Sequence, residues 1–177
     1  VICGTDSEEI PVSLEGNSDS FRMKLSFLPN GNCVILPNIN GRGYGFFKIT
    51  EGESSGLWSV LRSSEDEVLK GSLLITLYEN LRWKTISPQG FREEMLAYLP
   101  NESNSLLFSM ALSYLGDCQR IFPSDSRPLE QVLWKIVTTN PVSQHRLQAF
   151  RLYRSIADSE EAVQRLYTLW QERKAPK

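Results

Sequence analysis

The sequence is short of the residues that hold metal ions. It has a single histidine, His145, and three cysteines, and neither a His-Glu-x-x-His segment nor a Cys-x-x-Cys clip occurs in it. A zinc site needs three or four such ligands at set spacings. We therefore predict no metal ligand, no cofactor-binding residue and no catalytic residue in this chain. His145 is expected to be a histidine of a helix start or of the surface.

Disulfides, membrane spans and nucleic-acid binding are also not indicated. The cysteines are odd in number and far apart, at Cys3, Cys33 and Cys118, so we expect plain buried or half-buried thiols. Apolar runs such as Leu73–Leu77 fall far short of the ~20 residues that cross a bilayer. Lys and Arg total 19 against 21 Asp and Glu, which leaves no positive field to attract phosphates.

The first 50 residues are rich in short β-type runs separated by polar turns. In Phe21–Phe27 apolar and polar residues alternate without a break, which is typical of a strand with one buried face. We predict an antiparallel, β-sandwich-like domain over residues 1–52. Its strands are expected at Val1–Thr5, Ile10–Leu14, Phe21–Phe27, Cys33–Leu36 and Tyr44–Ile49.

Beyond this point the apolar residues recur at helical spacing, so residues 53–177 are predicted to form an all-α domain of antiparallel helices, similar to an α-solenoid. The fold class predicted for the whole chain is therefore α+β. Ser64 and Glu67 have the spacing of a capping box, and Ser87-Pro88 is a typical helix start. Helices are expected at Ser64–Trp83, from Ser87 onward, and at Asn104–Arg120, Pro128–Thr139, Val142–Ala157 and Glu160–Lys174, the last capped by Asp158 or Ser159.

One segment allows an enzyme as an alternative. Gly52-Glu53-Ser54-Ser55-Gly56 has the spelling of a nucleophile elbow, with Ser54 as nucleophile, His145 as base and Asp125 as orienting acid of a serine hydrolase. The same segment is equally typical of a flexible linker in which Ser54 or Ser55 caps a helix. Because the predicted strands are antiparallel and no further strands follow, the sequence favours the linker.

Residues 36–47, Leu-Pro-Asn-Ile-Asn-Gly-Arg-Gly-Tyr-Gly-Phe-Phe, resemble the end of the small β domain in zinc metallopeptidases of the aminopeptidase N type, with Asn38, Gly43 and Tyr44 on the pattern. The resemblance extends over about residues 33–115. It includes the helix Lys70–Leu81, in which Lys70 and Thr76 stand where the family usually has Arg and Asp. It also includes Ile86-Ser87-Pro88 and the run Met95–Glu102, whose Tyr98 and Glu102 belong to a Tyr-Leu-x-x-Glu ending.

The resemblance implies a parent enzyme that removes N-terminal residues from peptides with zinc held in a domain upstream of Val1. This chain would be its non-catalytic C-terminal region, shaping and covering the cavity that peptides enter. The implied partners are the parent's catalytic domain and its peptide substrate. Because the chain begins at Val1 without Met and stops after Lys174–Lys177, we expect a piece of a longer protein.

A stand-alone helical module that binds a protein or peptide, without enzymatic activity, remains the main alternative. The open edges of a small β domain also predict pairing with a second copy or cover by the helices. The last helix is expected to expose an apolar strip that includes Val163 and Trp170. The sequence favours no particular cellular compartment.

Overall fold

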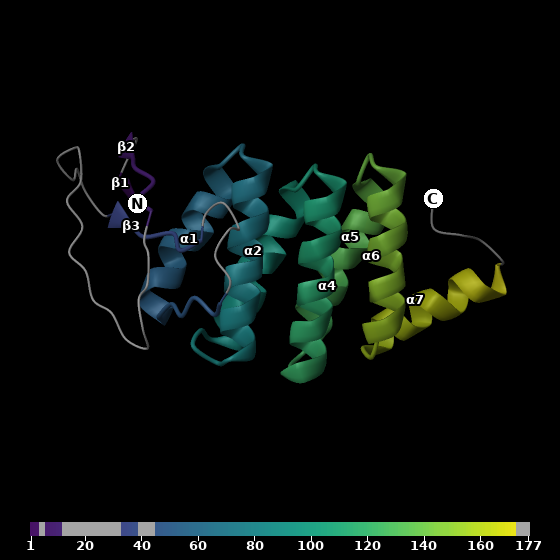
Figure 1. Cartoon of the computed structure of the whole chain (residues 1–177). Coiled ribbons are helices and arrows are strands. Elements are labelled where there is room, and N and C mark those ends of the chain that lie inside the picture. Colours follow the sequence, from purple (N-terminus) through teal and green to yellow (C-terminus); the bar gives the residue numbers. More distant parts are fainter. Residues whose placement is uncertain (4–5, 12–32, 39–44, 173–177) are drawn as a thin grey trace.

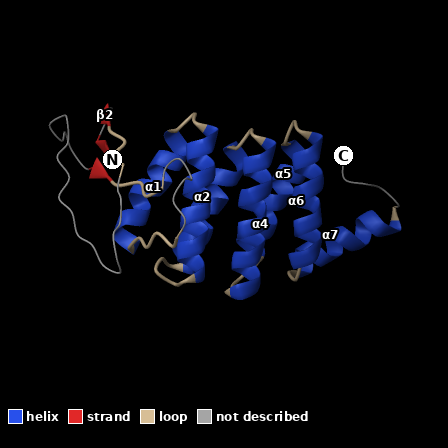
Figure 2. Ribbon diagram, viewed as in Figure 1, coloured by secondary structure: helices blue, strands red, loops and turns tan. Residues whose placement is uncertain are grey.

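The computed structural model describes residues 1–3, 6–11, 33–38 and 45–172, and within these ranges the chain is mainly helical (Figure 2). The described residues form seven α-helices and one 3-10 turn, which follows α3 directly. The other connections have three to five residues, and such short connections make neighbours antiparallel. The elements are α1 (Glu51–Ser63), α2 (Glu67–Arg82), α3 (Pro88–Tyr98), η1 (Leu99–Asn101), α4 (Ser105–Ile121), α5 (Arg127–Thr139), α6 (Ser143–Ile156) and α7 (Glu160–Gln171).

The helices form two layers. Helices α2, α4 and α6 lie side by side, and α1, α3 and α5 each pack against a member of this row (Figure 1). Helix α7 lies at the end of the array opposite to α1 (Figure 1). Stacked helix pairs of this kind are characteristic of α-solenoids, in which each pair contacts only its neighbours.

One continuous apolar core runs between the layers. Leu61 of α1, Leu74 of α2, Leu115 of α4 and Leu129 of α5 are fully buried members of it. Burial of one such side chain contributes about 1.5–3 kcal/mol. Apolar packing between the layers is therefore the main source of the stability of the array.

A buried carboxylate closes the corner between α5, α6 and α7. Glu130 of α5 accepts hydrogen bonds from the backbone N–H groups of Asp158 (2.9 Å) and Ser159 (3.2 Å) and from the Ser126 hydroxyl (3.0 Å). The Ser159 hydroxyl donates to the same carboxylate. Burial opposes ionisation, but these hydrogen bonds outweigh it and lower the pKa of Glu130. The start of α7 is thereby fixed to α5.

The prediction of an α+β fold with an N-terminal β-sandwich is wrong. The described residues before α1 contain three strands of two residues each: β1 (Ile2–Cys3), β2 (Asp6–Ser7) and β3 (Cys33–Val34). They form one antiparallel sheet in the order β2-β1-β3. A sandwich requires two packed sheets, with strands usually of about 5–6 residues, and neither is found among the described residues.

Of the predicted strand Tyr44–Ile49, the described part Gly45–Ile49 lies on α2 instead of in a sheet. In its described part, Ile49 N–H donates to Asn80 Oδ1 (2.9 Å), and Asn80 Nδ2 donates to the Phe47 carbonyl (2.8 Å). Asn80 is a fully buried residue of α2. Since a helix side chain satisfies these backbone groups, they are not used to pair with another strand. The alternating run Phe21–Phe27 lies outside the described residues.

The helical part begins earlier than predicted, at α1. The Thr50 hydroxyl accepts from Glu53 N–H (3.4 Å), and the Glu53 carboxylate accepts from Thr50 N–H (2.6 Å), which makes a capping box. Gly52–Gly56 therefore lies within a helix and is not a linker. Gly56 allows β3 to pack directly on α1, because a Cβ there would lie 2.7 Å from Val34 Cγ2.

The other predicted helix starts have mixed outcomes. Ser87, followed by Pro88, and Ser159 are confirmed as N-caps of α3 and α7. The capping box at Ser64 is wrong, because Ser64 ends α1 and Asp66 caps α2 by accepting from two backbone N–H groups. The domain boundary between residues 52 and 53 stays a prediction.

The expectation of plain thiols is wrong for Cys33. This residue is disulfide-bonded, and the β1–β3 pairing sets Cys3 opposite to it. Cys118 of α4 is a buried free thiol, and burial raises its pKa.

The predicted apolar strip on the last helix is confirmed, with Val163 50% and Trp170 74% exposed. Among the described residues, no helix combines the length and the apolar character that a membrane span requires.

Candidate functional site

The residues of the serine-hydrolase alternative do not come together. Ser54 lies inside α1, is buried, and its hydroxyl donates to the Glu51 carbonyl (2.7 Å). His145 belongs to α6, well along the array from α1 (Figure 1). Asp125 forms an exposed ion pair with Arg127 (2.7 Å). A nucleophile elbow requires a sharp strand-to-helix turn and a hydrogen bond from nucleophile to base, and Ser54 has neither.

His145 is fully buried, so the expectation of a surface histidine is wrong, although it does lie in the first turn of α6. Its Nε2 lies 3.0 Å from the Ser105 hydroxyl, and its ring stacks on Phe108 of α4 with centroids 4.0 Å apart. Nδ1 has no hydrogen-bond partner among the described residues. A catalytic Ser–His pair needs a third group that orients the ring. The geometry instead makes His145 a contact between α4 and α6, and burial lowers its pKa.

A buried polar cluster contains Tyr98 and Glu102, which belong to the family resemblance, and Lys70, which stands where the family usually has Arg. Glu102 is almost fully buried just before α4, and its carboxylate accepts hydrogen bonds from the Tyr98 hydroxyl and from Asn104 N–H (2.7 Å). Lys70 of α2 forms an ion pair with the same carboxylate. The Lys70 ammonium also lies 5.5 Å from the centroid of the Tyr98 ring. Three elements are joined here: α2, the end of α3, and the start of α4.

The electrostatics of this cluster follow from its hydrogen bonds. Burial by itself raises the pKa of Glu102, but the hydrogen bonds from Lys70, Tyr98 and Asn104 more than offset burial and lower it. Burial and the neighbouring carboxylate raise the pKa of Tyr98 far above its ordinary value, so it stays a hydrogen-bond donor. Because every charge is paired, the arrangement favours a structural role over acid–base chemistry.

A groove of about 830 Å³ lies between α2, α4 and the segment that precedes α1. Much of its surface is apolar and open to solvent: Val68 is 69%, Ile75 45% and Leu106 74% exposed. At one end Phe46 packs against Trp83, with ring centroids 5.6 Å apart. Exposed apolar surface gathered in a groove is typical of a site that binds a ligand or a partner protein.

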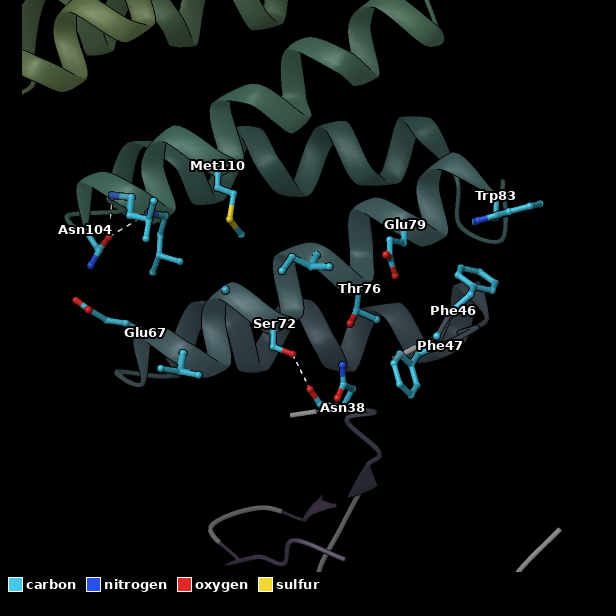
Figure 3. Close-up of a pocket in the computed structure, with 16 residues that line it drawn as sticks. Asn38, Phe46, Phe47, Glu67, Ser72, Thr76, Glu79, Trp83, Asn104 and Met110 are labelled. Atoms are coloured by element: carbon cyan, nitrogen blue, oxygen red, sulfur yellow. Dashed lines mark hydrogen bonds between the residues drawn. The ribbon is translucent and has the colours of Figure 1, made fainter. Parts of the chain in front are cut away.

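The charged side chains found among the described lining residues lie toward the ends of the groove. Among the described residues that line it, Glu67 and Glu79 are the only charged ones. Figure 3 shows Glu67 with Asn104 toward one end, and Glu79 near Trp83 toward the other. Along the floor, the Ser72 hydroxyl donates to the Asn38 carbonyl (2.9 Å).

Sequence reasoning missed this groove. Its signal was a second apolar stripe along α2: Val68 and Ile75, and Trp83 directly after the helix, are out of phase with the leucines that enter the core. A helix that is apolar on more than one face buries both faces or offers one to a ligand. The sequence alone could not show which of these applies, because the answer depends on α4.

Within the described residues no group of three or more His, Cys, Asp or Glu side chains is placed to hold a metal ion. In comparisons with known proteins, no family model, no curated protein and no solved structure matches this chain.

Proposed function

We propose that this chain is a non-catalytic helical region of a zinc-dependent aminopeptidase of the aminopeptidase N type, in which it walls the cavity that peptides enter. The observation that carries this proposal is the buried cluster of Lys70, Tyr98 and Glu102. Tyr98 and Glu102 belong to the Tyr-Leu-x-x-Glu ending of the resemblance, and Lys70 stands where the family usually has Arg. The three meet although they lie on different elements. A shared architectural motif with Lys in place of Arg accounts for this meeting.

The proposed role needs a fixed shape more than reactive side chains. The cluster joins α2, α3 and α4 through one buried carboxylate, and Glu130 joins α5 to the start of α7 in the same way. Ties of this kind hold neighbouring helices at a set spacing. The zinc and the catalytic residues belong, in this proposal, to a domain upstream of Val1.

The test begins with the reading frame that encodes Val1–Lys177. We expect a His-Glu-x-x-His segment upstream, and we expect the full-length protein to bind zinc and to hydrolyse aminoacyl-anilides. The 177-residue chain alone is expected to do neither. A full reading frame without that segment, or stoichiometric zinc bound by the isolated chain, would overturn the proposal.

A stand-alone module that binds a protein or peptide is the second candidate. The observation in its favour is the apolar groove between α2 and α4, which a purely structural wall does not require. The same reading frame separates the two candidates, because the second expects no peptidase domain.

A further inference from the structure

The groove between α2 and α4 has the properties of a site for a particular kind of ligand. One wall is a stripe of α2 at helical spacing that includes Val68, Ile75 and Glu79. The other is the first half of α4, where Leu106 is largely exposed and Met110 points toward α2 (Figure 3). The apolar surface of the two helix walls suits apolar side chains, and burying each contributes about 1.5–3 kcal/mol when complete.

The carboxylates toward the ends of the groove favour a ligand with positive charges at its ends. The carboxylates of Glu67 and Glu79 form no ion pair with any described residue. Lys70, the lysine of α2, is already paired with the buried Glu102. A ligand with a positive charge at each end would therefore find a free carboxylate at each end.

The spacing of these carboxylates sets the length. Glu67 and Glu79 are 12 residues apart on one helix, which corresponds to about 18 Å along its axis. An extended peptide rises about 3.3 Å per residue, so about six residues span this distance.

An extended segment is the shortest peptide that joins the two carboxylates. A helix rises about 1.5 Å per residue and would need about 12 residues to span the same distance.

We propose that this groove binds an extended peptide segment of about six residues with apolar side chains in its middle and a lysine or arginine at each end. The apolar side chains lie between Ile75 and Leu106, and the two cations meet Glu67 and Glu79. This inference does not depend on the aminopeptidase proposal, because it rests only on the groove.

The probe is a pool of blocked hexapeptides with lysine at both ends and leucine, valine or phenylalanine between them. Binding to the 177-residue chain is measured by backbone amide chemical shifts and by the anisotropy of a labelled peptide. We expect saturable shifts confined to α2, the first half of α4 and residues 45–47. Replacing both lysines of the pool by glutamate is expected to abolish binding.

Groove variants and matched controls separate this site from general attraction to an acidic protein. Glu67→Gln/Glu79→Gln is expected to weaken binding about three- to tenfold, and Leu106→Ser about five- to tenfold. The controls Glu160→Gln and Leu147→Ser change an exposed carboxylate and a half-exposed leucine outside the groove, and they are expected to leave the affinity unchanged.

Three results would overturn the proposal. The first is no binding of the pool at ~1 mM. The second is equal binding of the glutamate-ended pool. The third is an equal loss of affinity in the groove variants and in the controls, which would show attraction by the overall charge instead of recognition in the groove.

Discussion

Replacing Lys70 by Met tests the cluster on which the proposed function rests. The substitution keeps the length and the apolar stem of the side chain but leaves the Glu102 carboxylate buried without its cation. The Glu102 side chain is 1% exposed and that of Lys70 is 16% exposed. Removing one partner of a buried ion pair lowers the free energy of unfolding by about 3–5 kcal/mol. Because Lys70 reaches water at its tip, we expect about 2–3 kcal/mol of lost stability for Lys70→Met.

Glu102→Gln should cost less than Lys70→Met. The amide oxygen still accepts from Tyr98 and Asn104, and the freed Lys70 ammonium can turn toward water. We expect a loss of about 1–1.5 kcal/mol. The double variant should then lose less than the sum of the single losses, with a coupling energy of about 1–2 kcal/mol, because the orphaned charge is gone.

Urea unfolding followed by circular dichroism measures these differences, and pH adds an independent check. In the native chain the pKa of Glu102 is lowered, so its stabilisation is present above the ordinary carboxyl range and is lost as pH falls through the lower folded pKa. In Lys70→Met the contributions of Lys70 that lower the pKa of Glu102 are lost, so we expect burial to raise its folded pKa above the unfolded one. Protonation then relieves the buried charge, so the stability gap to the native chain should narrow from about pH 7 to about pH 5.

A loss below about 0.5 kcal/mol for Lys70→Met, together with a gap that does not change with pH, would refute this reasoning. That outcome would mean that water screens the Glu102 carboxylate and that the cluster does not tie the helices together. Lys135→Met, on the exposed face of α5, is the matched control and should change stability by less than about 0.5 kcal/mol.

Two further predictions concern other buried polar groups. Burial lowers the pKa of His145 from its ordinary 6.5, so as pH falls the unfolded chain is protonated before the folded one, and stability should fall below about pH 6.5. His145→Phe should flatten the fall of the urea midpoint in this pH range. An unchanged slope in the variant would show that His145 does not cause the fall. Glu130→Gln should cost about 2 kcal/mol and speed amide hydrogen exchange in α7. The exposed Glu161→Gln is its control, and equal effects of the two would contradict the role given to Glu130.

Local chemistry allowed most helices to be predicted. At Ser87-Pro88 and Ser159 the cap side chain and the following one-sided apolar stripe are all that the helix start requires. Both signals lie within a few residues of sequence. Ser64 shows the limit, because Asp66 two residues later offers a carboxylate that caps the same helix.

The strands could not be predicted in the same way, because β-type residues form strands only where a partner strand is present. The run Gly45–Ile49 has suitable residues but finds Asn80, 31 residues beyond Ile49, as its hydrogen-bond partner. No residue near that run in the sequence predicts this contact. At Gly45–Ile49 the β-type residues that contributed to the sandwich prediction contact α2 instead of a partner strand.

Only part of the candidate site could be predicted from the sequence. That α2 has a surplus apolar stripe is visible in the sequence from Val68 and Ile75. That the stripe faces Leu106 across an open groove follows only from how α2 packs against α4. The burial of His145 at the start of α6 could not be predicted for the same reason, since Phe108 and Ser105, which contact it, lie about 40 residues earlier.

The buried cluster and the groove are parts of one arrangement. Lys70 lies on the helix that forms one wall, and Glu102 lies two residues before Asn104, which caps the other. The hydrogen bond from Asn104 N–H to Glu102 therefore sets the start of α4 relative to α2. A peptide that touches both walls binds only when they stand at this spacing, so its affinity must fall in any variant that lets α4 move away from α2. Lys70, Tyr98 and Glu102 thus also hold the shape of the groove, which explains why a polar cluster with no chemistry of its own lies beside an open apolar surface of α2.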